Sequence, residues 1–108
     1  MLEHLRRLEA RATPGLMAQV IPIFIDDTSE RLVTLREAVL RRDGDTVRQV
    51  AHTLHGSAAS VGASSMMVGC AAVIEGVRLG EFERCEAFVA ELVADFESIR
   101  RAAEATGV

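Results

Sequence analysis

The stretch Ala51-His52-Thr53-Leu54-His55-Gly56-Ser57-Ala58-Ala59-Ser60-Val61-Gly62-Ala63 decides how this chain folds. At about 100° per residue on a helical wheel, one face collects apolar side chains: Val47, Val50, Ala51, Leu54, Ala58 and Val61. The other face collects Arg48, His52, His55, Gly56 and Ala59. The pattern predicts a helix from Asp45 to about Ser60, ended by Gly62. This helix buries one side and exposes a histidine among very small residues on the other.

Three further long amphipathic segments surround this helix. The first runs from Thr13, as N-cap, and Pro14 to about Arg41, and Pro22 inside it predicts a kink or a break near residues 18–21. The other two run from Ser64 or Ser65 to Gly80, and from Glu81 to about Ala105. Their expected core positions keep a helical period: Met17, Val20, Ile21, Phe24, Leu32, Leu35, Val39, Met66, Cys70, Val73, Ile74, Val77, Phe82, Cys85, Phe88, Val89, Leu92, Phe96 and Ile99.

The connections between these segments are short. In the turn Arg42-Asp43-Gly44-Asp45 we expect Gly44 to be the left-handed residue and Asp45 to cap the next helix. A short helix from Met1 to about Ala12, with Leu2, Leu5 and Leu8 on one side, is expected to lie across one end. With no alternating strand pattern of useful length, the sequence predicts one all-α domain, residues 1–108. Its architecture is an antiparallel up-down four-helix bundle with a short extra N-terminal helix.

Composition narrows the classes of partner. The net charge is −4, and the twelve basic residues are all arginine and are spread along the chain. A phosphate-binding surface needs clustered cations, so we expect no nucleic-acid partner. No apolar run approaches the roughly 20 residues of a membrane span, and the N-terminus resembles no signal peptide. We therefore expect a cytoplasmic protein without a membrane partner, in which Cys70 and Cys85 are small buried residues.

Two sets of side chains could be mistaken for metal sites. The acids in Asp26-Asp27-Thr28-Ser29-Glu30 lie on the outer side of a continuing helical stripe, so we interpret them as a solvated face. His52 and His55 are three residues apart and could share a metal, but a closed zinc site needs about four ligands and no second pair is visible. We expect no metal site and no cofactor.

The residues alone leave the exposed histidines open to two readings. They could be ordinary surface residues, or His52 could accept a phosphoryl group, because a neutral imidazole is a competent nucleophile. The second reading explains the small neighbours. Gly56, one turn after His52, removes a side chain that would crowd an incoming protein, and no acid follows Asp45 on this face to repel a phosphoryl group.

Residues 51 to 63 closely resemble the signature of histidine-containing phosphotransfer domains, which reads roughly Ala-His-x-Leu-Lys-Gly-Ser, four residues, then Gly-Ala. The similarity extends from about Gly15 to Ile99. It includes Phe24-Ile25-Asp26-Asp27-Thr28, Arg31-Leu32, Leu35-Arg36-Glu37-Ala38, Asp43, Cys70, Glu75 and Gly80-Glu81-Phe82. The fold of that family is a helical bundle, in agreement with the helical pattern.

The resemblance implies a phosphorelay function. His52 would be the phosphoacceptor, exchanging a phosphoryl group with the aspartate of a receiver domain, and Gly56 would keep the approach clear. The domain would need no metal of its own, since magnesium is expected on the receiver. It would have no kinase activity, because no nucleotide-binding motif is present, and we expect a monomer.

The chain departs from the family at one position. His55 stands where the family usually carries lysine, and Arg48, one turn before His52, is the candidate to supply the missing cation. The alternative is a bundle of the same fold that docks to partners without being phosphorylated, and only the residue at position 55 favours it.

Overall fold

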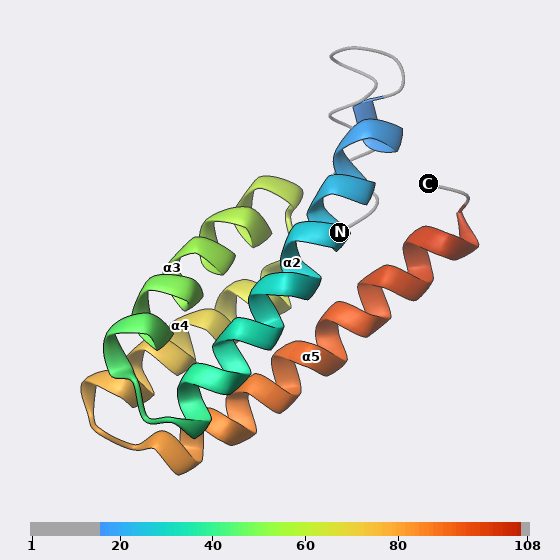
Figure 1. Cartoon of the computed structure of the whole chain (residues 1–108). Coiled ribbons are helices and arrows are strands. Elements are labelled where there is room, and N and C mark those ends of the chain that lie inside the picture. Colours follow the sequence, from blue (N-terminus) through green and yellow to red (C-terminus); the bar gives the residue numbers. More distant parts are fainter. Residues whose placement is uncertain (1–15, 107–108) are drawn as a thin grey trace.

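Four helices make up the part of the chain that the computed structural model describes, residues 16–106 (Figure 1). They are α2 (Leu16–Leu40), α3 (Gly44–Val61), α4 (Ser64–Arg78) and α5 (Phe82–Ala105). No strand occurs within these residues. The predicted N-terminal helix over residues 1–12 and the predicted cap at Thr13 and Pro14 lie outside the described range.

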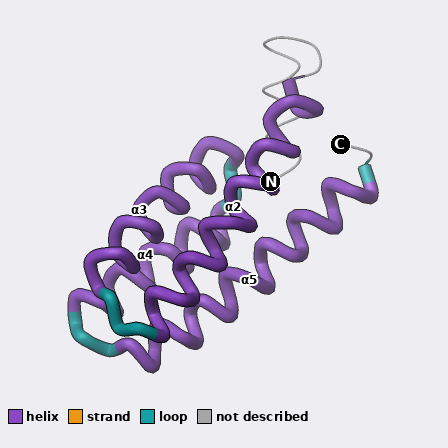
Figure 2. Tube along the Cα trace, viewed as in Figure 1, coloured by secondary structure: helices purple, strands orange, loops and turns teal. Residues whose placement is uncertain are grey.

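The helices pack in a closed ring of neighbours. α2 contacts α3 and α5, and α4 contacts the same two helices. Figure 2 shows that the loops between them are short, so the chain reverses direction at each one. The described residues therefore form an all-α four-helix bundle, as predicted, with the α2–α5 pair on the side opposite the α3–α4 pair.

The core is aliphatic and follows the predicted stripes. Predicted positions that are fully or almost fully buried are Ile21, Phe24, Leu32, Leu35, Val39, Val47, Ala51, Leu54, Ala58, Val61, Met66, Cys70, Val73, Cys85, Val89, Leu92 and Phe96. Val20, Val50, Ile74, Val77, Phe88 and Ile99 pack against them from partly buried positions. Phe24 and Phe96 form an aromatic pair with ring centroids 6.5 Å apart, which joins α2 to α5.

The turn before α3 differs from the prediction. Arg42, not Gly44, is the left-handed residue, with φ of 56°. Gly44 is instead the first residue of α3, and the N-cap is Asp43, whose side chain accepts a hydrogen bond from the Thr46 N–H. The prediction placed the cap two residues late because it assigned Gly44 to the turn. A side chain at Gly44 would come within 3.2 Å of Val77, so close packing favours glycine there.

Pro22 does not interrupt α2, whereas four glycines shape the helix ends and the contact between α4 and α5. α2 runs through Pro22 without a break, so a break near residues 18–21 is excluded. Gly62 and Gly80 are left-handed, as the helix ends predicted for them require. Gly69 and Gly76 allow α4 and α5 to approach closely, because an added Cβ would lie 2.8 Å from Leu92 and 2.7 Å from Cys85.

Candidate functional site

His52 lies on the exposed face of α3, the helix that residues 44–61 form. The helix is oriented by five buried side chains on its opposite face: Val47, Ala51, Leu54, Ala58 and Val61. Because the wheel position of His52 is nearly opposite that of Leu54, burial of the apolar stripe turns the imidazole toward solvent. Within the described residues, no hydrogen bond or ion pair holds this imidazole.

Gly56 is exposed, one turn after His52 on the same face. Among the residues that the structure describes, none outside the same helix turn has an atom within 4 Å of a Cβ added at Gly56, and the backbone there has no positive φ. Glycine in a helix interior costs roughly 1 kcal/mol relative to alanine. Packing among residues 16–106 therefore gives no reason for a glycine at position 56, unlike positions 69 and 76. Exposed Ala59 extends the same low surface.

Arg48 and His55 flank the His52 surface. Arg48 lies one turn before His52, with a side chain that is 60% exposed. Its nearest charged partner is Asp45, at 3.7 Å between Nη2 and a carboxylate oxygen, and that carboxylate is itself 92% exposed. Such a loose surface pair holds the guanidinium weakly. His55 is half-buried and lies between the exposed face and the core face of α3.

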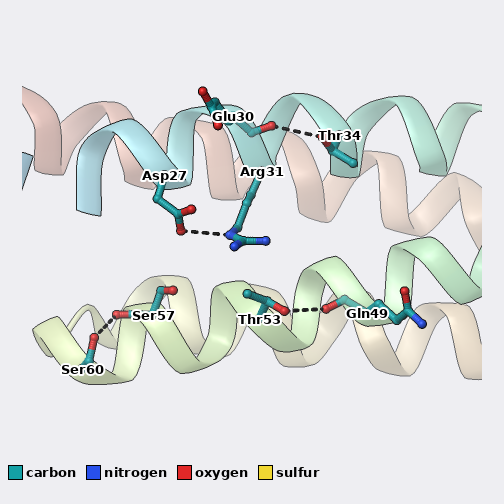
Figure 3. A network of polar contacts seen from close by, with 8 residues as sticks. All are labelled: Asp27, Glu30, Arg31, Thr34, Gln49, Thr53, Ser57 and Ser60. Atoms are coloured by element: carbon teal, nitrogen blue, oxygen red, sulfur yellow. Dashed lines mark hydrogen bonds and ion pairs between the residues drawn. The ribbon is translucent and has the colours of Figure 1, made fainter. Parts of the chain in front are cut away.

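The side of α3 that faces α2 is chemically different. Figure 3 shows Ser57 on this side, below Asp27 and Arg31 of α2. Ser57 and His52 are five residues apart, so they point about 140° away from each other around the helix. The exposed imidazole therefore faces away from α2.

The acidic run of α2 is only partly the solvated face that the sequence predicted. Asp26 and Glu30 are exposed, but Asp27 is half-buried and accepts a hydrogen bond from Arg31 Nε at 2.9 Å. This pair was not predicted, although the i, i+4 spacing of an acid and an arginine is its usual signal. The hydroxyl of Thr28 on the same helix is fully buried and has no hydrogen-bond partner within residues 16–106, which was not predicted either.

Residues 16–106 can also be compared with the requirements of a reactive thiol, a metal site and a membrane-spanning helix. Burial raises the pKa of the Cys70 thiol to about 11 and also raises that of Cys85, so neither forms a reactive thiolate near neutral pH. No group of three or more His, Cys, Asp or Glu side chains in this range is placed to hold a metal ion. None of the helices described is both long and apolar enough to cross a membrane.

Comparison with known proteins adds an independent result. Residues 19–103 match the Hpt domain family. The chain is similar to histidine-containing phosphotransfer protein 5 of Arabidopsis thaliana, with 33% identity over 84 residues. That match covers 75% of this chain and 54% of the relative, so the chain spans about half the length of the curated protein it resembles. No solved structure matches the chain.

Proposed function

Because the chain belongs to the Hpt domain family, we propose that it is a phosphorelay intermediate that carries a phosphoryl group on His52. Family membership implies histidine phosphotransfer in a phosphorelay. The proposal adds the acceptor residue, His52, and the partner, the phosphorylated aspartate of a receiver domain. The magnesium ion that the reaction needs would belong to that receiver.

The observation that carries the proposal is the open space at Gly56, one turn from an exposed histidine. A receiver must bring its aspartyl phosphate to the imidazole, so the helix surface around that imidazole has to be low. Gly56 and Ala59 keep it low, and Gly56 does so at a cost in helix stability that no contact within the described residues offsets. An incoming protein surface accounts for this cost.

The transfer step is a displacement at phosphorus. An imidazole with its proton on Nδ1 has a free lone pair on Nε2, and it is this lone pair of His52 that would attack the phosphorus. A P–N bond forms while the P–O bond to the aspartate breaks, and the aspartate leaves as a carboxylate. The reverse step passes the group to a second receiver. The phosphoryl group stays dianionic, so a cation beside it would stabilise the phosphorylated state.

Two neighbours of His52 would assist the transfer. Arg48 approaches from the preceding turn, and its loose pairing with Asp45 leaves donors available. His55 lies nearer the core, where an imidazole N–H can donate one hydrogen bond to a phosphoryl oxygen. We assign these two residues to stabilising the phosphoryl group and His52 to accepting it.

The test separates phosphorelay from docking without phosphorylation. The whole chain is incubated with a receiver domain that carries a radiolabelled aspartyl phosphate, and the label on the chain is treated with acid and with alkali. The proposal predicts label that is lost in acid and kept in alkali, as a phosphohistidine requires. Binding to receivers with no such label on the chain would overturn the proposal in favour of the docking module.

A further inference from the structure

The surface between α2 and α5 contains an apolar groove that the proposed function does not use. The groove has a volume of about 400 Å³, and its floor is formed by Val39 and Val89, which are almost fully buried. Leu40, 61% exposed, rises on the α2 side, and exposed Ala90 and Val93 line the α5 side. An exposed leucine beside a hollow lined by alanine and valine gives this surface both a projection and a recess of similar chemistry.

Opposite charges stand on the two walls of the groove. Arg36 lines it from α2 and Glu86 lines it from α5. Both side chains belong to exposed residues, and neither takes part in an ion pair within residues 16–106. Elsewhere on α2 and α5, Asp27 pairs with Arg31 and Glu97 with Arg100. The two charges beside the groove are therefore left for a partner.

We propose that the α2–α5 groove is the interface of a symmetric homodimer, in which Leu40 of each copy enters the groove of the other and Arg36 pairs with Glu86 across the two-fold axis. A two-fold axis brings the same patch of both copies together, so the patch must complement itself. This patch does so in shape, through Leu40 against Ala90, and in charge, through Arg36 against Glu86. The inference revises the monomer expected from the sequence.

The N-terminal segment of the same chain is a poorer occupant of the groove. Twenty residues of α2 separate Leu16 from Arg36, which is about 30 Å along the helix. A helix over residues 1–12, as the sequence predicts, would be about 18 Å long. The linker over residues 13–15, fully extended, adds about 14 Å between Ala12 and Leu16, so the segment could reach about 32 Å. It could just touch the Arg36 end of the groove, but it falls short of Leu40, which lies about 36 Å from Leu16 along the helix.

The dimer leaves the proposed phosphotransfer site free. The groove is on the α2–α5 side of the bundle, whereas His52 points away from α2 on the far side of α3. Both copies would therefore present His52 to receivers at the same time. Dimerisation through the groove does not depend on the chemistry of His52, so a negative result for one would not decide the other.

The test measures the mass of the whole chain by light scattering and sedimentation, from micromolar to millimolar concentration. We expect a reversible rise from 11.7 kDa toward twice that value. Leu40→Gln should weaken dimerisation at least about tenfold, because hot-spot side chains at interface centres carry most of the binding energy. Leu79→Gln is the matched control, since Leu79 is 51% exposed at the end of α4 and does not line the groove.

Charge exchange makes the test specific for this interface. Arg36→Glu and Glu86→Arg should each weaken self-association about tenfold, because like charges then meet across the axis. An equimolar mixture of the two variants should recover association to within about threefold of wild type, since opposite charges meet again. A wild type that stays at 11.7 kDa would overturn the proposal. So would a dimer that Leu40→Gln and the charge variants leave unchanged.

Discussion

His52 and Gly56 lie one turn apart on the exposed face of α3, and a Cβ at Gly56 would meet no atom of residues 16–106 within 4 Å outside its own helix turn. A helix gains stability from almost any other residue at this position. This pairing of an exposed imidazole with an unfilled neighbouring position is the surface that we propose a receiver domain contacts. The effect of Gly56 on phosphoryl transfer can be separated from its effect on stability by substitution.

Replacing Gly56 with glutamine should slow transfer without harming the fold. We expect Gly56→Gln to be as stable as wild type or up to roughly 1 kcal/mol more stable, since glutamine is a better helix former. The longer side chain should nonetheless lower the rate of phosphoryl transfer from a receiver at least about tenfold, by obstructing its approach. Thr53→Gln, an exposed position about 100° away from His52 around α3, should leave the rate unchanged. Normal transfer in Gly56→Gln would remove the clearance role.

Arg48 should matter to the phosphorylated state more than to the fold. Its side chain is 60% exposed and its contact with Asp45 is loose, so Arg48→Ala should change stability little. Without the cation, the phosphohistidine should hydrolyse several-fold faster, or transfer from the receiver should slow by a similar factor. Arg48→Lys, which keeps a cation at this position, should retain most of the wild-type phosphohistidine lifetime and transfer rate. Transfer and hydrolysis that are both unchanged in Arg48→Ala would show that the guanidinium does not reach the phosphoryl group.

Thr28 is expected to reduce the stability of the bundle. Its hydroxyl is fully buried without a hydrogen-bond partner in the described part of the chain, and leaving such a group unsatisfied costs about 1–3 kcal/mol. Thr28→Val should therefore raise the free energy of unfolding by about 1 kcal/mol, measured by urea denaturation. Thr34→Val is the control, because that hydroxyl is exposed and already donates to the Glu30 carbonyl. A loss of stability in Thr28→Val would show that the hydroxyl has a partner in solution.

The N-cap of α3 should make stability depend on pH. The Thr46 hydroxyl, which donates to Asp43 at 2.7 Å, and the Thr46 N–H hold the pKa of the Asp43 carboxyl below its ordinary value. A carboxyl with a lowered folded-state pKa stabilises the fold above its unfolded-state pKa. That contribution is lost as the pH falls through the folded-state pKa.

Asp43→Asn should accordingly lower the urea midpoint at pH 7, and the difference from wild type should shrink as the pH falls below the ordinary range of aspartate. Thr46→Val removes the hydroxyl that lowers the pKa and should weaken the same pH dependence from the other side of the bond. A difference between wild type and Asp43→Asn that stays constant across this pH range would contradict the assignment.

Helical periodicity predicted most of the fold because each stripe of apolar residues had one helix to belong to. The positions of Leu54, Cys70 and Leu92 in the core follow directly from their spacing. The turn before α3 was harder to predict from the sequence. Glycine is typical of a helix end, and the close approach of Val77 to Gly44 cannot be seen in a single sequence. Without that contact, nothing favoured Asp43 over Asp45 as the cap.

The exposure of His52 and Gly56 was also predictable, since both lie opposite the apolar stripe of the same helix. The groove between α2 and α5 was not, because it depends on how Leu40 and Ala90 are placed on two helices far apart in the chain. The lack of neighbouring atoms around Gly56 within the described residues likewise could not be predicted from the sequence. The sequence shows a glycine, but only the structure separates Gly56 from the crowded Gly69 and Gly76.

The most direct test of the central claim compares His52→Gln with His55→Gln in transfer from a receiver that carries a labelled aspartyl phosphate. Both positions are on α3 and neither imidazole is in the core, so both variants should fold, as circular dichroism and urea denaturation can verify. The account predicts that His52→Gln abolishes acid-labile label on the chain and that His55→Gln retains it, with a shorter lifetime. Label that survives in His52→Gln and disappears in His55→Gln would contradict the assignment of the phosphoacceptor.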